Sequence, residues 1–155
     1  TAKAWLKQGN ALMAKGDLAG AMAAFQTAIK LKPDDADAYT NLGVVYYRQG
    51  DLANAETTLR QAIKLAPRDP VSHYLLGITF LQSGQLDQAE SFLKQANSLD
   101  PDLPEPYYGL GALYQIQGKK DAAIAAFQHF LEIGPGQDPR AMDEAKKQLR
   151  TLEGK

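Results

Sequence analysis

The 155-residue chain contains no cysteine, which excludes a disulfide framework, a cysteine-ligated zinc or iron–sulfur site and a thiol nucleophile. It also lacks any apolar run approaching the roughly 18 residues of a membrane span, so we expect no membrane insertion of this segment. Excess charge is absent too, because 17 Lys and Arg stand against 18 Asp and Glu, a formal net charge of −1. Nucleic-acid binders carry a strongly basic surface, and we therefore expect no nucleic-acid partner.

The cellular location of the chain is not fixed by its sequence. No signal peptide is visible, and the chain begins at Thr1 rather than Met, which leaves open whether a start, a signal or an anchor has been removed. The absence of cysteine is compatible with reducing and oxidising compartments alike. A cytoplasmic location is slightly favoured over a periplasmic or membrane-tethered one.

What the chain does have is an internal repeat of 34 residues. Small residues and proline recur at this spacing in four columns: Gly9, Gly43, Gly77, Gly111; Gly16, Gly50, Gly84, Gly118; Ala21, Ala55, Ala89, Ala123; and Pro33, Pro67, Pro101, Pro135. From average glycine and proline usage, the chance of filling the glycine and proline columns three more times is about one in 10¹¹. The sequence is therefore an array of similar units.

Each unit is predicted to be a pair of helices of about 14 residues. In the second unit, large and small residues alternate at i, i+3, i+4 and i+7, the spacing of one helical face: Tyr39, Leu42, Gly43 and Tyr46. Gly50 is expected to end that helix, and Asp51 to cap the next one. A second apolar stripe follows and stops at Pro67: Leu52, Ala55, Leu59, Ala62 and Ile63. The small columns predict close helix approach, and the large ones fill the space beside it.

These columns resemble the tetratricopeptide repeat family. The second unit carries the family signature as Tyr39, Leu42-Gly43, Tyr46, Gly50, Ala55, Leu59, Ala62 and Pro67, and the third as His73, Leu76-Gly77, Phe80, Gly84, Ala89, Leu93, Ala96 and Pro101. The resemblance implies an all-α fold, a right-handed superhelical α-solenoid of four helix-turn-helix repeats. It places the repeats at residues 2–35, 36–69, 70–103 and 104–137 of one domain spanning 1–155. In repeat four, Phe130 departs from the family pattern, which has a small alanine there.

Residues 138–153 do not continue the repeat. Asp138-Pro139 is a typical helix start, and one apolar stripe follows it: Ala141, Met142, Ala145, Leu149 and Leu152. This segment resembles the family's capping helix, which covers the open end of the last hairpin. The N-terminal end shows no counterpart.

Catalytic and cofactor chemistry finds no support in the residue pattern. His73 occupies an aromatic column, which favours packing, and His129 is expected in solvent near Glu132. The glycines form neither GxGxxG nor a P-loop, and no HExxH spacing occurs. We therefore predict a non-enzymatic protein with no cofactor and no metal.

The resemblance also places a candidate binding surface. In tetratricopeptide arrays the first helix of each repeat lines the concave side, which predicts a peptide-binding groove formed by Leu6, Asn10, Met13, Asn41, Val44, Tyr47, Arg48, Tyr74, Leu75, Ile78, Leu81, Tyr108, Ala112, Gln115 and Ile116. Thr40, Gln82 and Glu105 are expected on the same surface. The helix at 70–83 is apolar almost all round, which indicates burial or a face offered to a partner. Stacking between repeats is the alternative explanation for these side chains.

Two known uses of the fold do not match these residues. Some family members clamp a peptide carboxylate with Lys and Asn. Asn10 and Asn41 match the asparagine positions of that clamp, but the basic positions hold Leu6, Val71 and Leu75. Glycosyltransferase-associated arrays carry an asparagine ladder, whose positions here hold Lys7, Asn41, Leu75 and Gly109. The prediction is thus an adaptor that binds a peptide or helical segment through apolar and aromatic contacts. A self-assembling homo-oligomer and a docking domain of a larger protein remain the alternatives.

Overall fold

The computed structural model describes residues 1–134 and 138–155, and within these ranges it contains helices and turns but no strand. The helices are α1 (Ala2–Ala14), α2 (Leu18–Leu31), α3 (Ala36–Arg48), α4 (Leu52–Leu65), α5 (Pro70–Gln82), α6 (Leu86–Leu99), α7 (Glu105–Ile116), α8 (Lys120–Ile133) and α9 (Pro139–Leu152). The predicted all-α solenoid of helical hairpins is confirmed.

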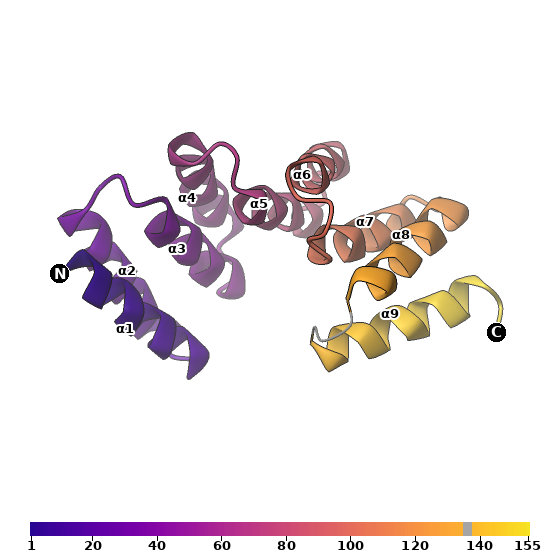
Figure 1. The fold of residues 1–155 in the computed structure, drawn as a ribbon, viewed down its shortest axis with the longest axis horizontal. Coiled ribbons are helices and arrows are strands. Elements are labelled where there is room, and N and C mark those ends of the chain that lie inside the picture. Colours follow the sequence, from indigo (N-terminus) through magenta and orange to yellow (C-terminus); the bar gives the residue numbers. More distant parts are fainter. Residues whose placement is uncertain (135–137) are drawn as a thin grey trace.

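The hairpins stack in chain order to form an arch (Figure 1). Each odd-numbered helix from α1 to α7 packs on the helix that follows it. The helices α2, α4 and α6 pack on the first helix of the next hairpin, and α8 packs on α9. Further contacts join α1 to α3, α3 to α5 and α5 to α7, so the first helices of successive hairpins form one continuous layer. Because α4 and α6 lie on the outer side of the arch, α3, α5 and α7 lie nearer its opening.

The turn inside each hairpin depends on a glycine in the left-handed conformation. Gly50 has a φ of 77°, and Gly16, Gly84 and Gly118 have similar values. This conformation brings the Asp51 amide 2.9 Å from the Tyr46 carbonyl oxygen, which closes the end of α3. The Asp51 side chain then accepts a hydrogen bond from the Asn54 amide and caps α4. In the first two hairpins the turn is therefore set locally by a glycine and the aspartate after it, whereas Gln85 and Lys119 stand in the cap position of the other two without a side-chain cap.

The other glycine column sets the distance between the two helices of a hairpin. A Cβ atom added at Gly77 would lie 2.8 Å from Cγ of Leu93, and one added at Gly43 would lie 2.6 Å from Cγ of Leu59. Both leucines are fully buried. The predicted pairing of a small column with a large one therefore describes the packing inside the hairpins.

The C-terminal helix α9 covers the last hairpin. Phe130 is only 2% exposed and packs with Phe127 and Ala145, and Met142 and Leu149 border the same cluster. The departure of Phe130 from the family pattern has a physical reason here. Its neighbour is α9 rather than the first helix of another repeat, and a large ring fills the different gap.

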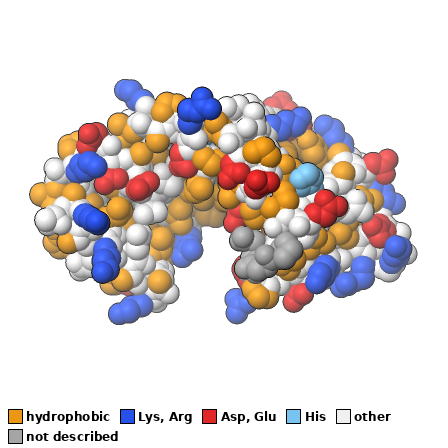
Figure 2. All heavy atoms as spheres, in the orientation of Figure 1, with side chains coloured by type: hydrophobic (Ala, Val, Ile, Leu, Met, Phe, Trp, Pro, Cys, Tyr) orange, Lys and Arg blue, Asp and Glu red, His pale blue; other side chains and the backbone are white. Residues whose placement is uncertain are grey.

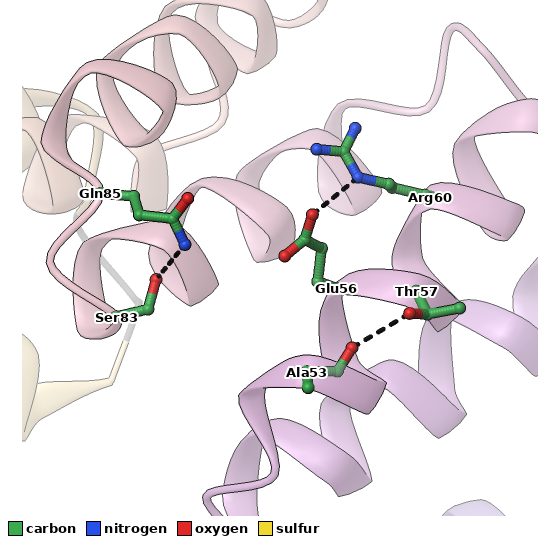
Figure 3. A network of polar contacts seen from close by, with 6 residues as sticks. All are labelled: Ala53, Glu56, Thr57, Arg60, Ser83 and Gln85. Atoms are coloured by element: carbon green, nitrogen blue, oxygen red, sulfur yellow. Dashed lines mark hydrogen bonds and ion pairs between the residues drawn. The ribbon is translucent and has the colours of Figure 1, made fainter.

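On the outer side of α4, Arg60 and Glu56 form an ion pair with each other (Figure 3). Nε of Arg60 donates to Oε1 of Glu56 at 3.0 Å, and the guanidinium lies 5.4 Å from the ring centre of Phe80 and 5.8 Å from that of Phe92. Arg60 thereby shields aromatic surface of the core while its charge is balanced within the same helix.

Candidate functional site

The inner layer of helices forms a pocket of about 370 Å³. We call it the apolar pocket, and it is lined by Tyr47, Tyr74, Ile78, Leu81, Gln82, Tyr108, Gly109, Ala112 and Ile116. These residues come from α3, α5 and α7, which lie side by side in the array. Figure 2 shows the molecule hollowed between its two ends, with hydrophobic side chains at the roof of the hollow.

The three tyrosines give this pocket aromatic walls with polar tips. Burial raises the pKa of Tyr74 well above its usual range, and the nearby Glu105 carboxylate and the Tyr47 and Tyr108 phenols add to this effect. Burial also raises the pKa of Tyr47 and of Tyr108. All three phenols therefore stay neutral at physiological pH. In the described part of the chain, none of their hydroxyls has a hydrogen-bond partner, so they remain available to a ligand.

The rim of the pocket carries an exposed apolar side chain. Ile116, at the end of α7, is 63% exposed. The walls are less exposed, because Tyr74, Ile78 and Leu81 are partly buried. They pack against the central hydrophobic cluster, which includes the buried Leu76, Phe80 and Leu93. These three side chains belong both to the hydrophobic core and to the pocket surface. Packing between repeats and binding of a partner are therefore compatible roles for them.

Several predicted groove residues lie outside the pocket. Leu6 and Met13 pack against the N-terminal hydrophobic cluster, which is formed by Ala21, Phe25, Leu42 and Val45. Leu75 packs against the central cluster. Nδ2 of Asn41 donates to Oδ1 of Asn10 at 3.0 Å, which joins α3 to α1.

The remaining predicted positions are Val44, Arg48 and Gln115. Val44 is half-buried, and Arg48 is exposed at the end of α3. Nε2 of Gln115 donates to Oε1 of Gln148 at 2.7 Å and thereby connects α7 to α9. The binding role assigned to these positions stays a prediction.

The placement of Thr40 on the concave surface is wrong. Its side chain is buried between α3 and α5, where its Oγ1 lies 2.8 Å from Oγ of Ser72. Ser72 Oγ in turn donates to Oδ2 of Asp69 at 2.5 Å. A hydroxyl in this position serves the contact between two repeats, which a single repeat's pattern does not reveal.

Gly109 is a pocket residue that the sequence analysis did not assign to the groove. A Cβ atom there would lie 3.0 Å from Cδ2 of Leu93 and 3.7 Å from Cγ2 of Ile78. The absence of a side chain at Gly109 thus lets α7 approach the preceding hairpin, and no side chain at this position fills the pocket. The sequence did contain a clue: Gly109 lies in the middle of the predicted helix, two residues before Gly111, where no turn requires a glycine. A glycine at such a position indicates close packing.

The two histidines lie where the sequence predicted. His73 is buried, its Nδ1 lies 2.8 Å from the Asp69 carbonyl oxygen, and its ring packs near Phe92. His129 is exposed and stacks on Tyr107, with ring centres 4.1 Å apart. Within residues 1–134 and 138–155, no group of three His, Asp or Glu side chains is placed to hold a metal ion. None of the helices described is long and apolar enough to cross a bilayer.

Comparison with known proteins identifies the class. A TPR repeat model matches residues 9–50, and two further tetratricopeptide repeat models match residues 34–102 and 80–149. The chain belongs to the tetratricopeptide repeat family, and it is a repeat scaffold for protein interactions. No curated protein sequence matches it closely enough to report.

Several solved structures are similar over most of the chain. A crystal structure of MamA matches with a TM-score of 0.76 and 25% identity, covering 99% of this chain and 82% of that one. TTC0263, a thermophilic TPR protein of Thermus thermophilus, matches with a TM-score of 0.88 and 23% identity over 99% and 84%. A mutant O-GlcNAc transferase of Thermobaculum terrenum matches with a TM-score of 0.80 and 26% identity, covering 84% of this chain but 26% of the transferase.

Proposed function

We propose that this chain binds a segment of a partner protein, extended or helical, in the groove formed by α3, α5 and α7. The contacts are apolar and aromatic, and the apolar pocket receives the main anchoring side chain. The chain itself performs no catalysis in this proposal and serves as an adaptor.

The observation that carries the proposal is the composition of the apolar pocket. Three tyrosine rings, Ile78 and Ile116 surround a space of about 370 Å³, within the range of small-ligand pockets. Tyrosine is enriched where proteins bind one another, because it combines a large contact area with a polar tip and few rotatable bonds. Ile116 leaves most of its side chain in water, and a partner that covers it would recover that apolar area.

A protein with a similar fold binds an acidic peptide. The first TPR domain of Spaghetti (RPAP3), bound to the HSP90 peptide SRMEEVD, matches with a TM-score of 0.73 and 20% identity, covering 76% of this chain and 93% of that one. That similarity concerns the fold alone. Our chain holds Leu6, Val71 and Leu75 where carboxylate-clamping arrays hold basic residues. We therefore expect the acidic peptide SRMEEVD to bind poorly here, which makes it a useful negative comparison.

The proposal is tested by selecting binders from a random-peptide phage library on the immobilised chain. Selected peptides are synthesised with a fluorescent label, and their dissociation constants are measured by anisotropy. Ile116→Gln should weaken their binding by roughly tenfold, because removing one anchoring side chain from an interface costs more than about 1 kcal/mol. Its stability should change by less than about 0.5 kcal/mol, since the side chain is mostly exposed.

Leu31→Gln is the matched control. Leu31 is 57% exposed, close to the value of Ile116, but lies at the end of α2 and lines none of the apolar pocket. This variant should bind the selected peptides as the parent chain does. Equal losses of affinity in the two variants, or selected peptides that ignore Ile116→Gln, would move the binding site away from the groove.

Self-association is the second candidate function. The N-terminal end of the array exposes Trp5, which is 36% exposed, and the larger part of Leu31. Such apolar surface at an open end of a stack can join copies of the chain. Light scattering over a range of concentrations separates this case from peptide binding, and Leu31→Gln together with Trp5→Gln should then reduce the average mass.

A further inference from the structure

A second pocket of about 380 Å³ adjoins the apolar pocket. The two share Tyr74 and Tyr108 as walls, so side chains that fill both would be close neighbours in a ligand. We call the second one the acidic pocket, and it is lined by Tyr74, Glu105, Tyr108, Phe130, Asp138, Arg140, Ala141 and Glu144. Its residues come from α5, α7, α8 and the N-terminal half of α9, with Asp138 as the cap of α9.

Glu105 is the residue that makes this pocket unusual. Its Oε2 atom is buried from solvent and has no hydrogen-bond donor among the residues that the structure describes. A buried carboxylate oxygen without a donor is unfavourable unless something supplies one. Glu105 lines the acidic pocket together with Tyr74, and its negative charge contributes to the raised pKa of Tyr74. The residue that carries the unsatisfied acceptor thus lines the space that a ligand would occupy.

The other charged groups leave the pocket negative. Oε1 of Glu144 accepts a hydrogen bond from Nε2 of Gln148 at 2.6 Å, and the Glu144 charge contributes to the raised pKa of Tyr108. Oδ1 of Asp138 accepts from the Arg140 amide at 3.0 Å and caps α9. The Arg140 side chain is exposed and makes no ion pair within the described ranges. Three carboxylates and one guanidinium give this lining a net charge of −2, against −1 for the whole chain.

We propose that the acidic pocket receives a lysine or arginine side chain of the same partner segment whose apolar residue fills the apolar pocket. This inference rests on the proposed function and adds a sequence requirement to it. The rings of Tyr74, Tyr108 and Phe130 can pack against the aliphatic part of a lysine or arginine side chain. Their faces also attract its cationic group. The cation supplies the donor that Glu105 lacks, and Glu144 adds a second negative charge. The partner is therefore an apolar-and-basic segment, opposite in charge to SRMEEVD.

The test compares one peptide pair with two protein variants. The first peptide is the tightest binder from the phage selection on the parent chain. The second is the same peptide with its basic residue replaced by methionine. The first protein variant is Glu105→Gln with Glu144→Gln, which keeps the side-chain shapes and removes two charges. The second is Asp121→Asn with Glu132→Gln, which removes two exposed charges on α8 that line neither pocket.

The proposal expects selected peptides to carry Lys or Arg at a fixed offset from an apolar residue. Replacing the basic residue by methionine should weaken binding to the parent chain about tenfold, and equally to the Asp121–Glu132 variant. The same replacement should have little effect, less than about twofold, on binding to the Glu105–Glu144 variant. Circular dichroism melting of all three proteins checks that they are folded, and the peptide replacement on the parent chain does not depend on that check.

Three outcomes would overturn the proposal in distinguishable ways. If peptides without a basic residue are selected and remain sensitive to Ile116→Gln, the acidic pocket takes no cation and the groove function stands. If the Asp121–Glu132 variant loses the preference for a basic residue as fully as the Glu105–Glu144 variant, overall charge is responsible rather than the pocket. If no selected peptide responds to Ile116→Gln, the groove function fails and the inference fails with it.

Discussion

Replacing Gly77 by alanine sets two opposing effects against each other. In the middle of α5, alanine is favoured over glycine by about 1 kcal/mol through helix propensity alone. The added Cβ, however, would lie 2.8 Å from Cγ of Leu93 and 3.2 Å from its backbone nitrogen. Leu93 is fully buried and cannot move away freely, because its Cδ2 also lies close to Gly109, where an added Cβ would be 3.0 Å from it. Overpacking of this kind costs about 1–3 kcal/mol, which equals or exceeds the helix-propensity gain, so we expect Gly77→Ala to lower the free energy of unfolding by up to about 2 kcal/mol.

A double-mutant cycle with Leu93→Ala tests this contact most directly. Leu93→Ala alone should destabilise by about 2–5 kcal/mol, because it leaves a cavity between α5 and α6. In that background the clash is gone, so Gly77→Ala should become stabilising by up to about 1 kcal/mol. Urea unfolding followed by far-ultraviolet circular dichroism measures all four chains, and equal m-values show that the comparison is valid. Gly77→Ala raising stability in the parent chain would refute the packing role of this glycine column.

Three further predictions concern the ends of the array and one buried phenol. Deleting residues 138–155 should lower stability by about 2–4 kcal/mol and promote aggregation, because Phe130 becomes exposed; an unchanged melting temperature would contradict the capping role of α9. Because the pKa of Tyr74 is raised in the folded chain, the stability that its neutral phenol contributes is present below about pH 10 and is lost as pH rises further. Tyr74→Phe should therefore flatten the alkaline decline of melting temperature, and parallel curves would contradict this. Amides of α1, which has a neighbouring repeat on one side within the chain, should exchange with solvent faster than those of α5, as native-state hydrogen exchange can measure.

The repeat columns predicted the packing inside hairpins because that packing is periodic. Gly43 faces Leu59, and Gly77 faces Leu93, at the same offset in successive repeats. The same contact therefore recurs in each repeat, and the residues that form it recur every 34 positions in the sequence. The predicted turns at Gly50 and its equivalents are local as well, since one positive φ ends one helix.

The candidate site was less predictable because it depends on contacts that do not repeat. Asn10 and Asn41 bond to each other, and Gln115 bonds to Gln148 on the capping helix, which the pattern of a single repeat cannot show. The same holds for the acidic pocket. Glu105 was expected on the concave surface, but its proximity to Glu144 depends on how α9 crosses the last hairpin. The sequence predicted α9 itself from its start and its apolar stripe, but not the side chains that α9 brings beside α7.

The central claim, that a partner segment occupies the apolar pocket, can be tested with isoleucine methyl groups as internal reporters. The chain has six isoleucines, of which Ile78 and Ile116 line the pocket, and Ile29, Ile63, Ile124 and Ile133 do not. Methyl NMR spectra are recorded while a phage-selected peptide is added to the selectively labelled chain. The account predicts saturable shifts at Ile78 and Ile116, with the other four signals nearly unchanged. Shifts confined to those four signals, with Ile78 and Ile116 unaffected at saturation, would contradict it.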